Sequence, residues 1–364
     1  MLEGTCVALF AFDVGFQIDL PKAGSLLAGA SPVGLKRAGR PSPGWFDFDP
    51  LPLGQVVESE PVAVGPLRSE PGIEIVMYDF GAVIASFRFP MRVEAEQLPG
   101  LGELLLNNQI LRRKAEEAVG RFLQGIEAAI ERPCLRDVVE DYVVFAIERW
   151  ADGVSPESLV EACAQFFAQA VEGETDSLSP EQVRRTLEPR LSYGPNDLAI
   201  VDWNGAVLFD AEPGDIVALL AHANVELLEL RILDQELDKL LERADETLAK
   251  LSRRRAWPVL VEPRLLREFA SVQTDAVVTF EGVNNAIKLL GNQYLARVYR
   301  LAAGRLDLPA WHSSVQRKLA ATDSVYQKLS DAVSIRRMEV LEIIIIVLIA
   351  VSIVLPFLPF GKIY

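Results

Sequence analysis

Hydrophobic residues follow two different spacings along the chain. Over 1–211, short runs of β-branched and aromatic residues alternate with stretches that contain Gly and Pro, which predicts strands mixed with helices. From residue 212 onward, apolar residues recur at three- and four-residue steps, which predicts long helices over 212–335. We therefore expect an α+β domain followed by a long antiparallel helical hairpin.

Turn-forming residues bound the elements expected in the α+β domain. Strands are predicted for 6–20, 55–64, 73–89 and 134–150, a Pro/Gly-rich loop for 21–54, and a helix for 94–131 that breaks near Pro99-Gly100. Ser155 and Ser179 each precede Pro-Glu and predict helix starts, because Ser caps a helix and Pro suits its first turn. Asn204-Gly205 lies between two β-rich runs and predicts a hairpin.

The helical region carries a seam typical of a coiled coil. Its apolar positions are Leu230, Leu233, Leu237, Leu240, Ala244 and Leu251. A second apolar pattern runs from Phe269 to Tyr294, after Pro258 and Pro263, so the two segments predict an antiparallel hairpin. A further stripe, made of Leu227, Leu241 and Leu248, lies beside the seam. Because exposed leucines are costly, we expect a second copy of the protein, or a third helix, to cover it.

The C-terminal segment is the most apolar part of the chain. No charged residue occurs from Ile343 to Phe360, which predicts a transmembrane anchor over 338–360. Arg336 and Arg337 precede this stretch and only Lys362 follows it, so the body is expected on the cytoplasmic side. The pattern thus predicts a tail-anchored, single-pass protein of the cell inner membrane.

Charge and composition exclude several classes of function. The net charge of −15 argues against a broad nucleic-acid interface, so no specific DNA partner is expected. The three cysteines, Cys6, Cys134 and Cys163, lie far apart and form no zinc motif, which indicates buried thiols in a reducing compartment. With only two histidines, no His-rich metal site is expected.

Motifs that would indicate catalysis are weak. Asp79-Phe80-Gly81 matches the magnesium-binding triplet of kinases, but the other kinase motifs are missing and the surrounding 76–84 is typical of a strand with a glycine bulge. The acidic groups Glu140-Asp141 and Asp234/Glu236/Asp238 fit solvated faces better than cation sites. Arg253-Arg254-Arg255 suits a helix end, with a lipid or RNA contact as the alternative.

No catalytic, cofactor-binding or metal-binding residue is therefore predicted, and no cofactor. The polar pairs Asn284-Asn285 and Asn292-Gln293 are expected to set helix register or to face solvent. Besides a non-catalytic scaffold, two other classes of function stay open. One is a metal-dependent enzyme with an acidic site near Asp79, Asp141 or Asp202, and the other is a regulatory sensor that binds a small ligand in the α+β domain.

Three segments resemble the bacterial type of the required-for-meiotic-nuclear-division family, a domain-of-unknown-function group that also has fungal members and a mitochondrial inner-membrane member. Tyr78-Asp79-Phe80-Gly81-Ala82-Val83 is similar to the family signature Tyr-Asp-[Tyr/Phe]-Gly-Val-Val. Residues 187–202 carry a second similarity. The third, 294–354, includes Arg337 and Leu341-Glu342 but has Ile343 where the family has a tryptophan.

The resemblance implies a membrane protein without established catalytic residues. It also implies an association with the translation apparatus, as for the family's mitochondrial inner-membrane member. We therefore expect a non-enzymatic, membrane-anchored scaffold or assembly factor. Its expected partners are the membrane, a second copy or another protein bound through the helical hairpin, and the ribosome.

Overall fold

The computed structural model describes residues 1–34, 50–253, 263–285 and 293–354. Two compact units make up this structure. The first contains residues 1–232 and 279–313, and the second contains residues 233–278 and 314–364 as far as they are described. Within the expected loop 21–54 the structure has a short helix and a short strand, while 35–49 lie outside the described residues.

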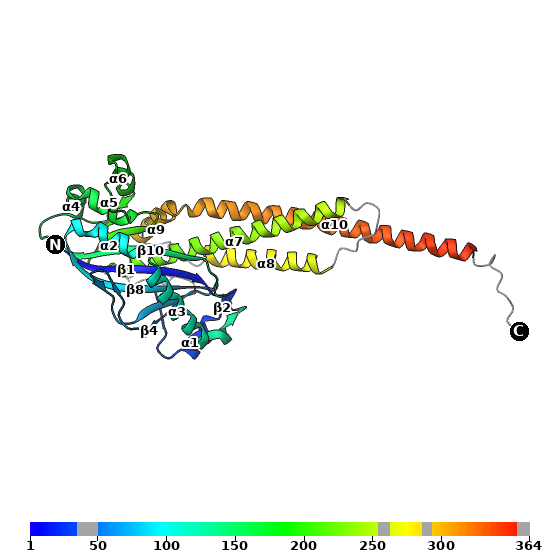
Figure 1. Ribbon diagram of the computed structural model, residues 1–364, viewed down its shortest axis with the longest axis horizontal. Coiled ribbons are helices and arrows are strands. Elements are labelled where there is room, and N and C mark those ends of the chain that lie inside the picture. Colours follow the sequence, from blue (N-terminus) through cyan, green and yellow to red (C-terminus); the bar gives the residue numbers. More distant parts are fainter. Residues whose placement is uncertain (35–49, 254–262, 286–292, 355–364) are drawn as a thin grey trace. The chain divides into compact units, whose positions relative to one another are not determined.

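A mixed sheet forms the centre of the first unit (Figure 1). Its strands, in spatial order, are β11 (Arg190–Leu191), β12 (Leu198–Val201), β13 (Gly205–Phe209), β10 (Val139–Arg149), β1 (Leu2–Asp13), β8 (Ala82–Val93), β7 (Ile73–Met77), β4 (Leu53–Val57) and β3 (Ser31–Pro32). All neighbouring strands are antiparallel except β10 and β13. Two small ribbons lie outside it, formed by β2 (Gln17–Ile18) with β9 (Ile130–Glu131) and by β5 (Ala63–Val64) with β6 (Leu67–Arg68).

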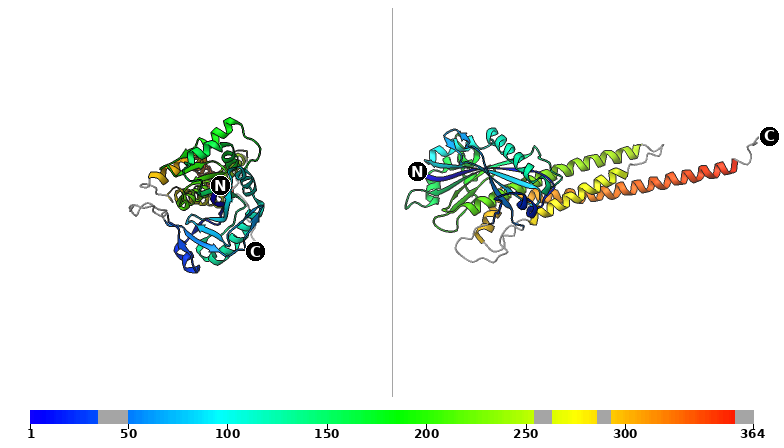
Figure 2. Two further views of the ribbon diagram at one scale, coloured as in Figure 1. Left: turned by 90° about the vertical axis from the view of Figure 1, so that its left-hand side faces the viewer. Right: turned by 90° about the horizontal axis from the view of Figure 1, so that it is seen from below.

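Both faces of the central strand β1 are buried, which explains its nearly continuous apolar sequence. On one face Phe10 and Phe12 belong to the main core. That core also takes in side chains from α2 (Leu98–Leu105), α3 (Gln109–Ile126) and α5 (Ala164–Glu172). On the other face Leu9 lies beside the first turns of α7 (Gly214–Arg253). Helices therefore cover the sheet on both sides (Figure 2).

The remaining helices are short in the first half of the chain and long in the second. They are α1 (Leu20–Leu26), η1 (Ala95–Gln97), η2 (Glu127–Ala129), α4 (Pro156–Ala162), α6 (Pro180–Leu187), α8 (Pro263–Asn285), α9 (Gln293–Arg305) and α10 (Leu308–Val354). The helix expected over 94–131 breaks at 106–108, and not at Pro99-Gly100. Asn108 provides the reason, since its side chain caps α3 by accepting from the backbone N–H groups of Ile110 and Leu111.

Three local predictions are confirmed. Ser155 caps α4 and Ser179 caps α6, each through its side-chain oxygen, and a proline follows each cap. A hairpin is also found at the predicted place, since β12 and β13 pair antiparallel, although residues 202–204 make the connection and Gly205 begins β13. These are sites where side-chain chemistry dictates the backbone, so the sequence alone specifies them.

The strand expected over 73–89 is two strands. β7 and β8 form a hairpin in which Met77 pairs with Val83, and Tyr78 N–H donates to the Ala82 carbonyl. Asp79, Phe80 and Gly81 make the turn, with Gly81 at a φ of 93°. The glycine does not mark a bulge within one strand but allows the chain to reverse.

The second unit has a small core of its own. Leu240 and Ala244 of α7 pack with Phe269 of α8 and Leu329 of α10, so three helices contribute to it. The described positions of the predicted seam, from Leu230 to Ala244, are all buried, while the side chain of Leu251 lies outside the description. In the stripe beside the seam, Leu227 is buried and Leu248 packs against this core. Covering Leu227 and Leu248 therefore requires no second copy, while Leu241, the third leucine of the stripe, is half-buried.

The expected transmembrane anchor over 338–360 is wrong. In the described part of the chain, no helix is long and apolar enough to cross a membrane. The described uncharged stretch of α10 runs from Ile343 to Val354, about 18 Å at 1.5 Å per residue, whereas a bilayer core measures about 30 Å. Residues 355–360 lie outside the description. The expectations of tail anchoring, inner-membrane localisation and a membrane partner rested on this anchor and are corrected with it.

Candidate functional site

One segment of α7 is buried on every side and still carries polar groups. Every residue from Leu219 to Leu230 is buried, although this segment includes His222, Glu226 and Glu229. The three residues are spaced by four and then three positions, so they share one face of the helix. Polar groups are costly in such a place unless neighbouring groups satisfy them, which makes this face the first candidate for a functional site.

The Tyr78–Gly81 turn lies against the beginning of this face. The ring of Tyr78 lies 5.5 Å from that of His222 and the ring of Phe80 lies 6.4 Å from it, measured between centroids. Burial lowers the pKa of His222 to about 3, so the imidazole is neutral at physiological pH. The β7–β8 turn thus packs two aromatic rings against a neutral, buried histidine.

A tight backbone contact holds the turn in place. Val14 N–H donates to the Gly81 carbonyl at 2.9 Å, and Ile18 N–H donates to the Asp79 carbonyl at 2.8 Å. A Cβ atom on Gly81 would overlap the carbonyl oxygen of Gly15. Glycine is therefore required here both for its positive φ and for the close approach of two chain segments.

Glu226 forms the centre of the buried face. Its side chain is 3% exposed; its Oε2 accepts a hydrogen bond from the Tyr299 hydroxyl of α9, and its Oε1 lies 3.4 Å from His312 Nε2 of α10. The ring of Phe280 on α8 lies 5.5 Å from that of His312. Helices α7, α9 and α10 therefore meet at one carboxyl group, and α8 contacts the ring of His312.

The pKa values within this cluster are displaced in a consistent way. Burial raises the pKa of Glu226 to about 7, against a smaller lowering by the Tyr299 hydrogen bond. Burial and the neighbouring Glu226 also raise the pKa of Tyr299, so the phenol keeps its proton and stays a donor. Both histidines of the chain lie at this cluster, which we name the Glu226 cluster: His222, Glu226, Tyr299 and His312.

A second polar contact joins the sheet to α9. Asp202, just after β12, forms an ion pair with Arg305, and its Oδ1 accepts the backbone N–H of Trp203 at 2.8 Å. The Tyr142 hydroxyl donates to the Asp202 backbone carbonyl at 2.9 Å. The Asp202 side chain is 6% exposed. Its partners give it a structural role that links β10, β12 and α9.

The three acids of the enzyme alternative lie on different elements. Asp79 is in the β7–β8 turn, and Asp202 is paired with Arg305. Asp141, on β10, accepts the backbone N–H of Asn107 at 2.7 Å. None of the three lines either of the cavities described in the first unit. Neither cavity therefore gathers these carboxylates, and the enzyme alternative stays a prediction.

The other acidic groups also have basic neighbours. Glu140 pairs with Arg231, and Asp234 and Asp238 both bind Lys318 Nζ at 2.7 Å. Among the described residues, no group of three His, Cys, Asp or Glu side chains could hold a metal ion. The basic triplet at 253–255 and the polar pairs at 284–285 and 292–293 fall outside the described side chains.

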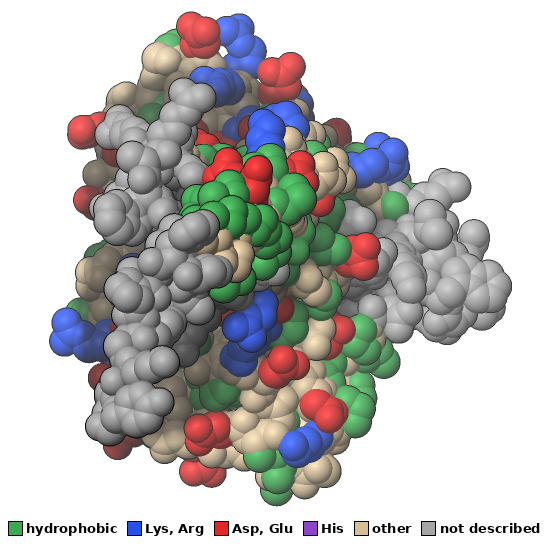
Figure 3. All heavy atoms as spheres, turned by 90° about the vertical axis from the view of Figure 1, so that its right-hand side faces the viewer, with side chains coloured by type: hydrophobic (Ala, Val, Ile, Leu, Met, Phe, Trp, Pro, Cys, Tyr) green, Lys and Arg blue, Asp and Glu red, His purple; other side chains and the backbone are tan. Residues whose placement is uncertain are grey.

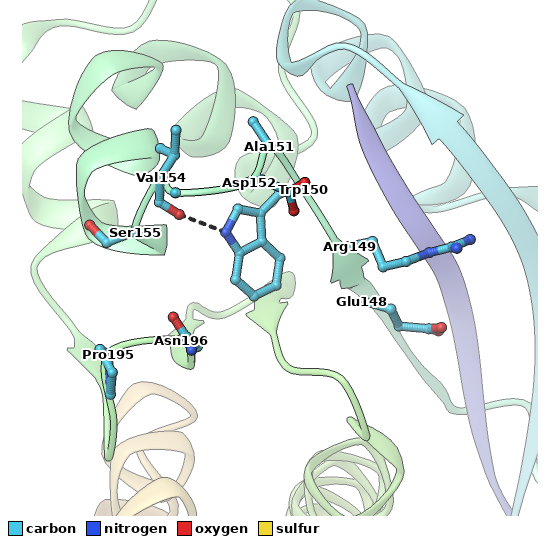
Figure 4. Close-up of a pocket in the computed structure, with 10 residues that line it drawn as sticks. Glu148, Arg149, Trp150, Ala151, Asp152, Val154, Ser155, Pro195 and Asn196 are labelled. Carbon is cyan, nitrogen blue, oxygen red and sulfur yellow. Dashed lines mark hydrogen bonds between the residues drawn. The ribbon is translucent and has the colours of Figure 1, made fainter.

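A cavity of about 590 Å³ opens at the end of β10 (Figure 4). The Trp150 indole lies at its centre, fixed by a hydrogen bond from Nε1 to the Val154 carbonyl at 2.8 Å and by an edge contact with the Phe209 ring. Asn196 and Arg149 are among the polar residues around it. This is the feature on which the small-ligand alternative depends, and that alternative stays a prediction.

Sequence reasoning missed the Glu226 cluster because its members are far apart in the chain. Glu226, Tyr299 and His312 come from three helices, and only the fold brings them together. One signal was available. His222, Glu226 and Glu229 repeat at helical spacing within an otherwise apolar run, where solvated acids are not expected.

Comparison with known proteins gives a family without an assigned function. The uncharacterized protein MJ0711 of Methanocaldococcus jannaschii is 20% identical over 193 residues, which is 52% of this chain and 56% of that protein. The alignment thus spans little more than half of this relative. No solved structure matches the chain. The profile of the domain described as "Uncharacterized protein MJ0711, N-terminal domain" matches residues 3–215.

That match includes the sheet and ends at the first turn of α7. The expected membership of an uncharacterized family is confirmed at this level, while the required-for-meiotic-nuclear-division family is not what the profile identifies. Because the profile covers more than half of its residues, the chain belongs to the family of the MJ0711 N-terminal domain.

Proposed function

We propose that the protein is a non-catalytic scaffold that self-associates through the apolar end of α10. The observation that carries this proposal is the exposure of large aliphatic side chains there. Between Leu341 and Ile353, ten Leu, Ile and Val side chains are each 48–61% exposed. Figure 3 shows hydrophobic side chains gathered around this end of the helix. Contiguous exposed apolar surface of this kind marks an interaction site.

The energy available from covering this surface is large. Full burial of one such side chain is worth about 1.5–3 kcal/mol, so half of that over ten side chains is on the order of 10 kcal/mol for each copy. Two copies together gain on the order of 20 kcal/mol, which exceeds the estimated cost of about 4–15 kcal/mol for association. A self-associated state is therefore energetically favourable.

The chemistry of the surface favours a second copy over a different protein. From Ile343 to Val354 there is no charge to select a partner of complementary charge, and the surface matches itself. Its aliphatic residues occupy every face of the helix, so more than one neighbouring helix is needed to cover them. We expect an assembly in which the α10 ends of several copies pack together.

Light scattering on the full chain and on a paired variant tests this proposal. Ile345→Glu with Ile349→Glu places two charges on one face of the apolar segment, because the positions are one helical turn apart. We expect the unmodified chain to give a multiple of its 40.1 kDa mass and the variant to give a smaller assembly. Far-ultraviolet circular dichroism should show that the helix content is retained.

The matched control is Gln316→Glu with Ala320→Glu. These two positions are also one turn apart on α10, and both are exposed outside the apolar segment. The control should keep the mass of the unmodified assembly. Equal loss of mass in both variants would mean that added charge, and not the apolar surface, governs association.

The scaffold would be related to the required-for-meiotic-nuclear-division family. The Tyr78–Val83 segment supports this relationship, since it forms the turn that encloses His222. The proposal then includes a contact with the ribosome. With a net charge of −15, that contact would involve ribosomal proteins more than phosphate groups. Cosedimentation with ribosomes that persists at high salt would support it, and its absence at low salt would contradict it.

A further inference from the structure

A hydrogen bond of His312 determines which of its ring nitrogens carries a proton. His312 Nδ1 is 2.9 Å from the Leu308 carbonyl oxygen, which is one turn earlier in α10. A carbonyl oxygen only accepts hydrogen bonds, so Nδ1 must carry the proton. In the neutral ring, Nε2 then has a lone pair and no hydrogen.

That lone pair faces another acceptor. Glu226 Oε1 is 3.4 Å from His312 Nε2, and the other carboxyl oxygen already accepts from Tyr299. A carboxylate opposite an unprotonated ring nitrogen would place two acceptors against each other in a buried site. Because an unsatisfied buried pair of this kind is costly, a proton is required between the two groups.

Among the residues that the structure describes, the other groups near Glu226 do not supply that proton. Tyr299 of α9 directs its hydroxyl to Oε2, and Phe280 of α8 places an apolar ring beside His312. On α7 itself, His222 lies one turn before Glu226 and is neutral, while Glu229 lies one turn after it and is another acid. The β7–β8 turn contributes the rings of Tyr78 and Phe80 beside His222.

We propose that Glu226 and His312 share a single proton, and that losing it weakens the attachment of α9 and the first turn of α10 to α7 within the first unit. This proton-sharing pair is independent of the self-association proposed above. It uses residues 293–313, while the association surface begins at Leu341.

The raised pKa of Glu226 places the loss of the shared proton near neutral pH. Burial raises the pKa of Glu226 from its ordinary 4.5 to about 7, so the folded state holds the proton more tightly than the unfolded state does. The resulting contribution to stability is complete below pH 4.5 and is lost as the pH rises to about 7. Over that range, the unfolding equilibrium constant should rise up to about tenfold per pH unit through this group.

Glu226→Gln tests the proposal directly. The glutamine amide can donate to His312 Nε2 and accept from the Tyr299 hydroxyl, so it imitates the protonated acid permanently. We expect chemical unfolding of the unmodified chain to become easier between pH 4.5 and about pH 7, and expect this pH dependence to be strongly reduced in the variant. Hydrogen exchange of 293–313, corrected for its intrinsic pH dependence, should follow the same pattern.

Two further variants keep the test decisive. Glu242→Gln changes an exposed acid on the same helix and should retain the full pH dependence. Tyr299→Phe removes a hydrogen bond that lowers the pKa of Glu226, so it should move the transition to higher pH. If Glu226→Gln fails to fold, this upward shift in Tyr299→Phe still distinguishes the outcomes.

Nuclear magnetic resonance of the two histidines gives an independent readout. Because the pKa of His222 is lowered to about 3, its ring signals should stay constant above about pH 5, while those of His312 should change with the transition. The proposal is overturned if Glu226→Gln keeps the pH dependence of the unmodified chain. It is also overturned if neutral His312 carries its proton on Nε2.

Discussion

Replacing Gly81 by alanine is expected to destabilise the first unit by about 3–5 kcal/mol. A residue with a side chain at a φ of 93° carries a strain of about 1–3 kcal/mol. The larger part arises because the new Cβ would overlap the Gly15 carbonyl oxygen. The hairpin turn and the 13–18 segment would have to move apart, which breaks the hydrogen bond from Val14 N–H to the Gly81 carbonyl.

Gly29→Ala provides a closely matched control. Gly29 has a φ of 95°, but a Cβ atom there would meet nothing within 4 Å. It should therefore cost only the backbone strain, about 1–2 kcal/mol. Chemical unfolding of both variants measures the difference. Similar losses for the two glycines would refute the importance of the Gly81–Gly15 contact.

Asp202→Ala is expected to cost about 2–3 kcal/mol of unfolding free energy. Removing one partner of a buried ion pair leaves the other charge uncompensated, which typically costs about 3–5 kcal/mol. The value is smaller here because the Arg305 side chain is 25% exposed and water can partly solvate it. The variant also loses the acceptor for the Trp203 backbone N–H.

The double variant Asp202→Ala with Arg305→Met separates charge from packing. With no guanidinium left beside the vacated position, it should be at least about 1 kcal/mol more stable than Asp202→Ala alone. Chemical unfolding at one pH measures the free energy of unfolding of the single and the double variant. A double variant less stable than the single one would show that Arg305 contributes mainly through packing. Loss of a cellular activity in Asp202→Asn with unchanged stability would instead favour the enzyme alternative.

The sequence specified those elements whose backbone depends on a nearby side chain. Ser155 and Ser179 are examples, since a cap is determined within about four residues. The 73–89 segment was predicted wrongly because Gly81 fits both a bulge and a turn in an apolar run. Only the contact with Gly15, which lies 66 residues earlier (81 − 15), distinguishes the two.

The sequence-based prediction missed the Glu226 cluster and misjudged the C-terminal segment for different physical reasons. Composition shows two histidines, but it cannot show that His312 lies against the α7 face that carries His222 and Glu226. At the C-terminus, the prediction counted uncharged residues up to Phe360, whereas the described uncharged helix ends at Val354. Similarly, the leucines at 227 and 248 looked uncovered in a two-helix hairpin. Leu227 is buried within the first unit, and Leu248 packs against a core to which α10 contributes Leu329.

Sedimentation equilibrium of the unmodified full chain, over a range of concentrations, tests the central claim most directly. If the apolar end of α10 joins copies together, the mass should exceed 40.1 kDa and should decrease toward that value on dilution. A single 40.1 kDa species at every concentration up to tens of micromolar would contradict self-association, because an exposed surface worth on the order of 10 kcal/mol per copy should then be occupied.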